Sequence, residues 1–106
     1  MPEHREKFDT LLDELERWNR RVNLTAVRDR AQMAVLHIQD SLSAQALLHG
    51  KRILDVGTGA GFPGLPLAIV EPEREFHLLD SNNKKIQFVQ HVARLLGLDN
   101  VTAVKA

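Results

Sequence analysis

The residues best suited to chemistry lie between Asp55 and Gly64, where an acidic side chain is followed closely by a glycine-rich stretch. Gly57, Gly59 and Gly61 alternate with other residues there. Because glycine has no Cβ, this backbone can turn sharply and approach a ligand closely. Amide groups at the start of a following helix would favour a negative group. A nucleoside that carries a carboxylate fits this combination.

A second acidic residue, Asp80, follows about 20 residues after the glycines, at the expected end of the next strand. A carboxylate in that place can accept hydrogen bonds from both hydroxyls of a bound ribose. The pairing is much more specific than a glycine loop alone. It predicts a nucleoside site shared by two strand ends.

A dinucleotide is the competing ligand, because residues 59–64 also match the pattern G-x-G-x-x-G. In the dinucleotide fingerprint the first glycine leaves the strand directly, whereas here Gly57 already does so. Asp55 would also repel a pyrophosphate, but it would pair with the amino group of a methionine. These features favour S-adenosylmethionine (SAM). The candidate cofactor-binding residues are Asp55, Gly57, Thr58, Gly59, Ala60, Gly61, Phe62, Asp80 and Ser81.

The segment 1–50 is predicted to be helical. Apolar residues at spacings of three and four predict a helix from about Glu3 to Asn19. A second helical pattern ends at His49-Gly50, where glycine acts as the stop. The expected apolar positions are Phe8, Leu11, Leu12, Leu15 and Trp18 in the first helix, and Met33, Leu36, Ile38 and Leu42 in the second.

Segment 51–106 has the pattern of alternating strands and helices. The order β-α-β-α-β predicts an α/β fold with a parallel sheet and right-handed crossovers. Such sheets normally have five or more strands, so the chain is expected to be truncated after the third. The expected features are a buried strand at 52–56, a helix near Leu65 with Pro66 in its first turn, a strand at 75–79, Ser81 as a helix cap, Gly97 as the helix end and a strand from 101 to 104.

Composition narrows the class of protein. The 106 residues include no cysteine, which excludes disulfides and thiolate chemistry, and 14 basic residues balance 14 acidic ones. No apolar run reaches the roughly 20 residues of a membrane span, so a cytoplasmic protein without membrane contact is expected. The five histidines have no metal-ligand spacing, and no metal is predicted.

Five short motifs occur in one order along the chain: Trp18-Asn19, Asn23-Leu24-Thr25, His37-Ile38-x-Asp40-Ser41, the glycine loop and Leu79-Asp80-Ser81. In these motifs the chain resembles the bacterial ribosomal RNA small-subunit methyltransferase G family, also called the glucose-inhibited division protein B family. The resemblance covers essentially the whole chain. It implies a Rossmann-like SAM-dependent methyltransferase fold, with Gly57 and Phe62 lining the cofactor site and Asp80 beside the ribose.

The resemblance also implies methyl transfer from SAM to N7 of one guanine in 16S ribosomal RNA, in the small subunit. Guanine N7 has a free lone pair at neutral pH, so no general base is required and no catalytic acid or base is nominated. The protein must instead place N7 in line with the methyl group. Two alternatives remain: a methyltransferase for a small molecule or a protein, and a SAM-binding fragment without activity of its own.

Basic residues near the first helix are candidates for holding the RNA backbone. Between Arg17 and Arg30 there are five arginines and one acid, Asp29. A solvated helix face is the alternative interpretation. His37, Asp40 and Ser41 could form a hydrogen-bonded cluster facing the cofactor loop, or could serve as a cap or an interface. The candidate RNA-binding residues are Arg17, Arg20, Arg21, Arg28 and His37.

Overall fold

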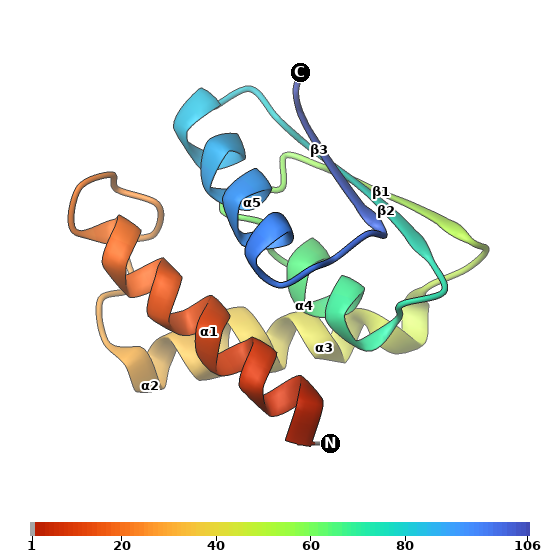
Figure 1. Ribbon diagram of the computed structural model, residues 1–106, viewed down its shortest axis with the longest axis horizontal. Helices are drawn as coiled ribbons and strands as arrows, with labels where there is room; N and C mark the ends of the chain where they lie inside the picture. The colour runs from red at the N-terminus through yellow and green to blue at the C-terminus, as the bar shows by residue number, and fades with distance from the viewer. Residues whose placement is uncertain (1) are drawn as a thin grey trace.

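The computed structural model describes the backbone of residues 2–106 and the side chains of residues 4–106. Three parallel strands form one sheet in the order β1-β2-β3, and the helices lie to one side of it (Figure 1). The predicted α/β fold with a preceding helical segment is therefore confirmed. The elements are α1 (Pro2–Asn19), α2 (Arg30–Met33), the π-helix η1 (Ala34–Gln39), α3 (Asp40–Ser43), the 3-10 helix η2 (Ala44–Leu47), β1 (Arg52–Val56), α4 (Gly64–Val70), β2 (Glu75–Asp80), α5 (Asn83–Leu95) and β3 (Val101–Lys105).

The sheet has one covered face and one open face. In the central strand β2, Phe76 and Leu78 are fully buried against the helices. The expectation that β1 is a buried strand is wrong, because Leu54 is 63% exposed and Val56 is 71% exposed. Side chains of a strand alternate between the two faces, and the described helices cover only one of them. Apolar composition alone therefore overestimated the burial of β1.

Helix α1 packs against the sheet-bearing part of the chain. Leu11 and Leu15 on its inner face are fully buried. Trp18, in the last turn, meets Phe88 of α5 edge to face, with the ring centroids 5.5 Å apart. Buried residues of the helical segment and of the sheet belong to one hydrophobic cluster. The domain boundary near Gly50 stays a prediction, but the two segments share a core.

The second helical stretch contains a register change that its apolar pattern did not predict. Met33 and Ile38 are buried, at 1% and 7% exposed, and they are separated by five positions. Leu36, which was expected to face the core, is 47% exposed. The π-helix η1 explains the difference, because its i→i+5 bonding brings residues five apart into line. The stretch ends at Leu47, ahead of Gly50.

The start of α5 differs from the expectation by one residue. Asn82, not Ser81, caps the helix: its side-chain oxygen accepts a hydrogen bond from the Lys85 backbone N–H at 3.0 Å. The Ser81 prediction is therefore wrong as a cap, and Ser81 is left exposed beside Asp80. Helix α4 carries Pro66 in its first turn as predicted, where the missing N–H has no intrahelical partner to lose.

The register change in the second helical stretch predicts that Met33 and Leu36 contribute very differently to stability. Met33→Ala should lower the free energy of unfolding by about 2–5 kcal/mol, because it removes a buried side chain. Leu36→Ala, three residues further along, should change it by about 0.5 kcal/mol or less. Urea unfolding of both variants measures the difference. Equal losses would mean that Leu36 is buried in solution and that the helix keeps a regular α register.

Candidate functional site

The carboxyl ends of β1 and β2 bring the two acidic motifs together. The strands pair in parallel, with Val56 opposite Leu79. Immediately after β1, the backbone N–H groups of Gly57 and Thr58 both donate to the carbonyl oxygen of Leu79, at 2.8 and 2.9 Å. The start of the glycine loop is thereby tied to the end of β2. Asp80, the next residue after Leu79, lies directly beside the loop.

Asp80 is held in the ionised form by the backbone around it. One carboxylate oxygen accepts from the Asn82 N–H at 2.8 Å, and the other accepts from the Gly59 N–H at 2.8 Å. These two bonds lower the pKa of Asp80. An ionised carboxylate offers about four lone-pair sites, so about two remain for further donors. A pair of ribose hydroxyls would match that remaining capacity.

Asp55 is hydrogen-bonded to the glycine loop near both of its ends. One of its oxygens accepts from the Thr58 hydroxyl at 2.7 Å and from the Gly64 N–H at 3.2 Å, near the two ends of the loop. Burial raises the pKa of Asp55, and the nearby charge of Asp80 adds to the rise, while the two bonds oppose it. A cationic group entering the site would favour ionised Asp55. The amino group of a methionine has the required charge.

The loop between the two carboxylates depends on glycine. Gly59 and Gly61 adopt positive φ values of 61° and 97°. A Cβ on Gly61 would also lie 2.4 Å from the Leu65 side chain, so an alanine there would be both strained and overpacked. The side chains of Thr58 and Ala60 are buried, at 3% and 6% exposed. Neither side chain therefore lies on the exposed surface of the loop.

Phe62, in the same loop, stacks on a residue from the helical segment. Its ring lies on the imidazole of His37, with the centroids 4.7 Å apart and the planes 18° from parallel. The Thr25 hydroxyl and His37 Nε2 are hydrogen-bonded at 2.9 Å. Burial lowers the pKa of His37, and the Asp40 charge partly opposes the change. His37 is therefore an interface residue between η1 and the glycine loop.

The expected cluster of His37, Asp40 and Ser41 takes a different form. The Ser41 hydroxyl donates to the backbone carbonyl of His37 at 2.5 Å rather than to its ring. Asp40 is exposed. The polar partner of the ring is Thr25, which the sequence pattern did not single out as a site residue. Its only signal was membership of the Asn23-Leu24-Thr25 motif.

The candidate arginines separate into two kinds. Arg28 donates to the Asn19 carbonyl and the Asn23 side chain, at 3.1 and 2.7 Å, and so shapes the turn after α1. Arg17 forms an ion pair with Glu14. Arg20 and Arg21 are exposed, and neither forms an ion pair with a side chain among residues 4–106.

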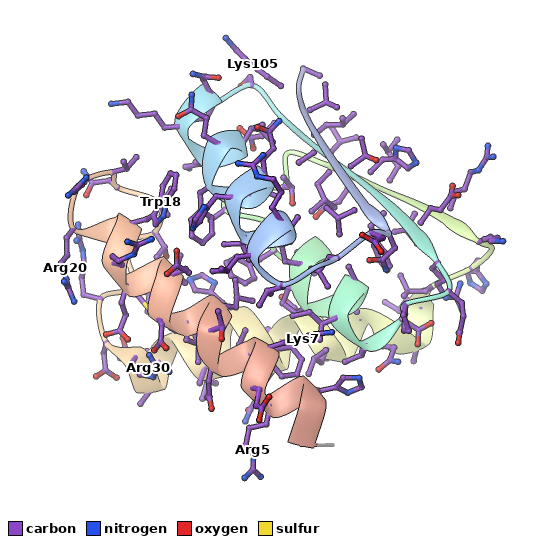
Figure 2. All side chains as sticks on the ribbon, in the orientation of Figure 1. Arg5, Lys7, Trp18, Arg20, Arg30 and Lys105 are labelled. Atoms are coloured by element: carbon purple, nitrogen blue, oxygen red, sulfur yellow. The ribbon has the colours of Figure 1, made fainter. Side chains whose placement is uncertain are left out.

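Arg20 and Arg21 line the same cavity as an aromatic side chain at the end of α1. A cavity of about 400 Å³ is lined by Arg17, Trp18, Arg20, Arg21 and Val22. Figure 2 shows Arg20 on the turn beyond α1 with Trp18 between that turn and α5. Buried Asn19 fixes the turn, because its side-chain oxygen accepts from the backbone N–H groups of Leu24 and Thr25 at 2.9 and 3.1 Å. The same turn thus carries the arginines and the hydroxyl that contacts His37.

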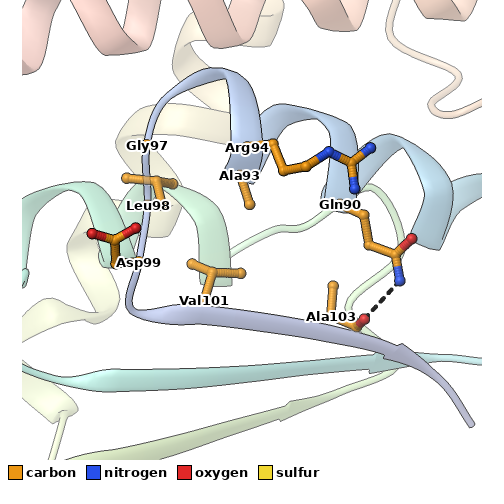
Figure 3. Close-up of a pocket in the computed structure, with 8 residues that line it drawn as sticks. All are labelled: Gln90, Ala93, Arg94, Gly97, Leu98, Asp99, Val101 and Ala103. Atoms are coloured by element: carbon orange, nitrogen blue, oxygen red, sulfur yellow. Dashed lines mark hydrogen bonds between the residues drawn. The ribbon is translucent and has the colours of Figure 1, made fainter.

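A larger hollow of about 650 Å³ lies between α5 and β3 and shares no residue with the glycine loop (Figure 3). Gln90 closes part of it by donating to the carbonyl oxygen of Ala103 at 2.8 Å. Within the described residues, no group of three or more acidic or histidine side chains could hold a metal ion. No helix in that part of the chain is long and apolar enough to cross a membrane. The strand ends remain the candidate site.

A parallel sheet with a glycine loop after one strand and an acidic residue ending the next is typical of the Rossmann-like fold of SAM-dependent methyltransferases. The solved structure of a SAM-dependent methyltransferase from Aquifex aeolicus is similar to this chain. It aligns with a TM-score of 0.56 and 28% sequence identity, over 74% of this chain and 42% of the Aquifex chain. The fold and the arrangement of the strand ends therefore place this chain in the class with the Rossmann-like fold of SAM-dependent methyltransferases.

Sequence comparison identifies the family. A family model described as rRNA small subunit methyltransferase G matches residues 4–106. Ribosomal RNA small subunit methyltransferase G of Methylococcus capsulatus is 53% identical over 104 residues, which cover 98% of this chain and 51% of that protein. The Aeromonas salmonicida protein of the same name is 54% identical over 96 residues, or 91% of this chain and 46% of that protein. The chain belongs to the ribosomal RNA small subunit methyltransferase G family, and it spans about half the length of these relatives.

The bonds to Asp80 predict a pH-dependent effect on stability. Asp80→Asn should lower the unfolding midpoint at about pH 7, because one amide oxygen cannot serve both Gly59 and Asn82. The pKa of Asp80 is lower in the folded protein than in the unfolded chain, where it is about 3.9, so ionised Asp80 stabilises the fold above that pH. This stabilisation is lost as the pH falls through the folded-state pKa. The difference between parent and variant should therefore shrink toward about pH 3.

Thermal unfolding across this pH range measures the effect, with exposed Asp99→Asn as the matched control. The control should show little difference at any pH. A loss in Asp80→Asn that stays constant with pH would contradict a role for the carboxylate charge.

Proposed function

We propose that this chain supplies the SAM-binding part of an enzyme that methylates N7 of a guanine in 16S ribosomal RNA of the small subunit. The observation that carries the proposal is the position of Asp80, ionised and bonded to the glycine loop, with acceptor capacity left for a ribose. The names of the relatives support ribosomal RNA as the substrate. The guanine N7 target is what the resemblance to the family implies.

In this proposal each part of the site binds a different part of SAM. Asp80 would accept the ribose hydroxyls, with exposed Ser81 beside it, and Asp55 would attract the methionine amino group. The main chain of residues 57–61 would approach the ligand closely, since three of those residues are glycines. The ring of Phe62 would line the same site. Bound SAM supplies a methyl group on a positively charged sulfur.

The transfer itself requires placement of the reacting atoms. N7 of guanine carries a lone pair, so no side chain has to remove a proton before attack. The protein would hold N7 at about 3 Å from the methyl carbon and in line with the bond to sulfur. Positive charge moves from sulfur to the purine, which a carboxylate-containing site tolerates. A guanine paired or stacked in RNA would first have to be exposed.

The RNA backbone would be held by the free arginines of the α1 end. Arg20 and Arg21 are the strongest candidates, because their charges are exposed and without an ion pair among the described side chains. Arg17 is a weaker one, since it already pairs with Glu14. Arg28 is engaged by the turn that it stabilises. If these arginines contact RNA phosphates, the affinity for RNA should fall as the salt concentration rises.

Two other functions are separated from this one by direct assays. The chain could bind SAM without transferring its methyl group, or the enzyme could act on a small molecule or a protein. Incorporation of labelled methyl into under-methylated small ribosomal subunits distinguishes transfer from binding alone. Loss of the incorporated label on RNase digestion distinguishes RNA from protein as the acceptor.

Calorimetric titration with SAM tests the cofactor site. Asp80→Ala should weaken SAM binding by about tenfold or more, because charge-assisted bonds to the ribose are lost. Asp99→Ala removes the same charge from an exposed position of the α5–β3 connection and should bind like the parent. Unchanged affinity in Asp80→Ala would contradict the assignment of Asp80 to the ribose.

Charge reversal tests the RNA surface. The double variant Arg20→Glu and Arg21→Glu should weaken RNA binding and reduce the slope of log K against log salt by about 1 to 2. Lys51→Glu, an exposed reversal before the amino end of β1, is the control and should leave the slope nearly unchanged. Filter binding of 16S RNA over a series of salt concentrations measures both. An unchanged slope in the double variant would exclude these arginines from the RNA surface.

A further inference from the structure

The stack of His37 on Phe62 joins two segments that have different tasks in the proposed function. Phe62 lies in the glycine loop, and its backbone N–H donates to the Thr58 carbonyl at 3.1 Å. His37 lies in η1 and is bonded to Thr25, on the turn that follows α1. The rings are nearly parallel at 4.7 Å. A continuous series of contacts, from Thr25 to His37 to Phe62, therefore links the arginine-bearing turn to the cofactor loop.

The details of this contact indicate that the imidazole serves as a fixed support. Its Nε2 is occupied by the Thr25 hydroxyl, which sets the orientation of the ring. The Ser41 hydroxyl donates to the His37 carbonyl, and the π-helix bonding of η1 surrounds the residue. Burial favours the neutral ring, which stacks on Phe62 without the cost of desolvating a charge. Phe62 itself is only half buried, so this support is a substantial part of its surroundings.

We propose that His37 is a positioning residue for the cofactor loop: stacked on Phe62 and oriented by Thr25, it holds the loop in the conformation that binds SAM. The inference rests on the proposed function, since it names what sets the SAM affinity of the same site. It also gives Thr25 a role, as the residue that orients the ring. Aromatic pairs of this geometry contribute about two- to tenfold in an equilibrium constant beyond burial.

Two substitutions of His37 separate stacking from hydrogen bonding. His37→Phe keeps an aromatic ring against Phe62 but loses the bond to Thr25. His37→Gln keeps a polar group near Thr25 but loses the ring. Thr25→Val leaves His37 in place and removes only its hydrogen-bond partner. It tests the same proposal if a His37 variant fails to fold. Gln39→Ala, exposed on the same π-helix, is the matched control.

The first measurement is amide hydrogen exchange of residues 57–62 by NMR, without ligand. His37→Gln should raise the exchange rates of the Gly61 and Phe62 amides by about two- to tenfold, and the control should stay near the parent. His37→Phe keeps the ring but loses the bond to Thr25, so its rise should be smaller than that of His37→Gln. Thr25→Val loses the same bond and should also give a rise smaller than that of His37→Gln. Parental exchange rates in both His37→Gln and Thr25→Val would overturn the proposal, and so would equal rises in His37→Gln and His37→Phe.

The second measurement is SAM titration of the same variants. His37→Gln should raise the Kd by about two- to tenfold, and His37→Phe, which keeps the ring, should raise it less. A parental Kd in His37→Gln would overturn the proposal. If the parent itself binds no SAM, the proposed function fails, but the exchange rates still decide whether His37 positions the loop.

Discussion

The site depends on one backbone connection, in which the carbonyl oxygen of Leu79 accepts hydrogen bonds from the N–H groups of both Gly57 and Thr58. It continues the pairing of β1 with β2 beyond Val56, so the glycine loop begins at the end of the neighbouring strand. With it, Asp80 lies within 2.8 Å of the Gly59 N–H, and its pKa falls because the backbone stabilises the charge. Two carboxylates in different surroundings result, since Asp55 is half-buried and bonded to the two ends of the loop, and partial burial raises its pKa. One is suited to hydroxyl donors and the other to a cation.

The helical segment is joined to this site rather than appended to the fold. Trp18 closes the core against Phe88, while buried Asn19 bonds the main chain of the following turn and fixes its path. That turn presents Thr25 to His37, and η1 presents His37 to Phe62. The π-helix matters here because it sets which side chains of the second helical stretch face inward. Burial of Met33 and Ile38 holds the face from which His37 reaches the loop.

Much of the fold, and the meeting of the glycine loop with Asp80 at the strand ends, could be predicted from the sequence, because local rules govern both. Alternating strand and helix patterns gave the β-α-β-α-β order, and the glycines with Asp80 at a strand end indicated the site. The failures have a common cause in tertiary context. The burial of Leu54 depended on whether both sheet faces are covered, and that of Leu36 depended on a local change from α to π geometry. The Thr25 contact joins residues 12 positions apart in different elements, which no periodicity reveals.

Charge counting alone would have misjudged the basic segment. The chain is neutral overall, and the arginines between Arg17 and Arg30 look equivalent in sequence. The structure separates them by their partners: Arg30 lies 2.7 Å from Asp13 and 2.6 Å from Glu16, which neutralises it and joins α2 to α1. Arg28 is bound to the turn. Within this segment, Arg20, Arg21 and Arg28 have no carboxylate partner among the described side chains, and Arg28 is held by the turn. Arg20 and Arg21 are therefore the charges of the segment that can reach a polyanion without breaking an existing contact.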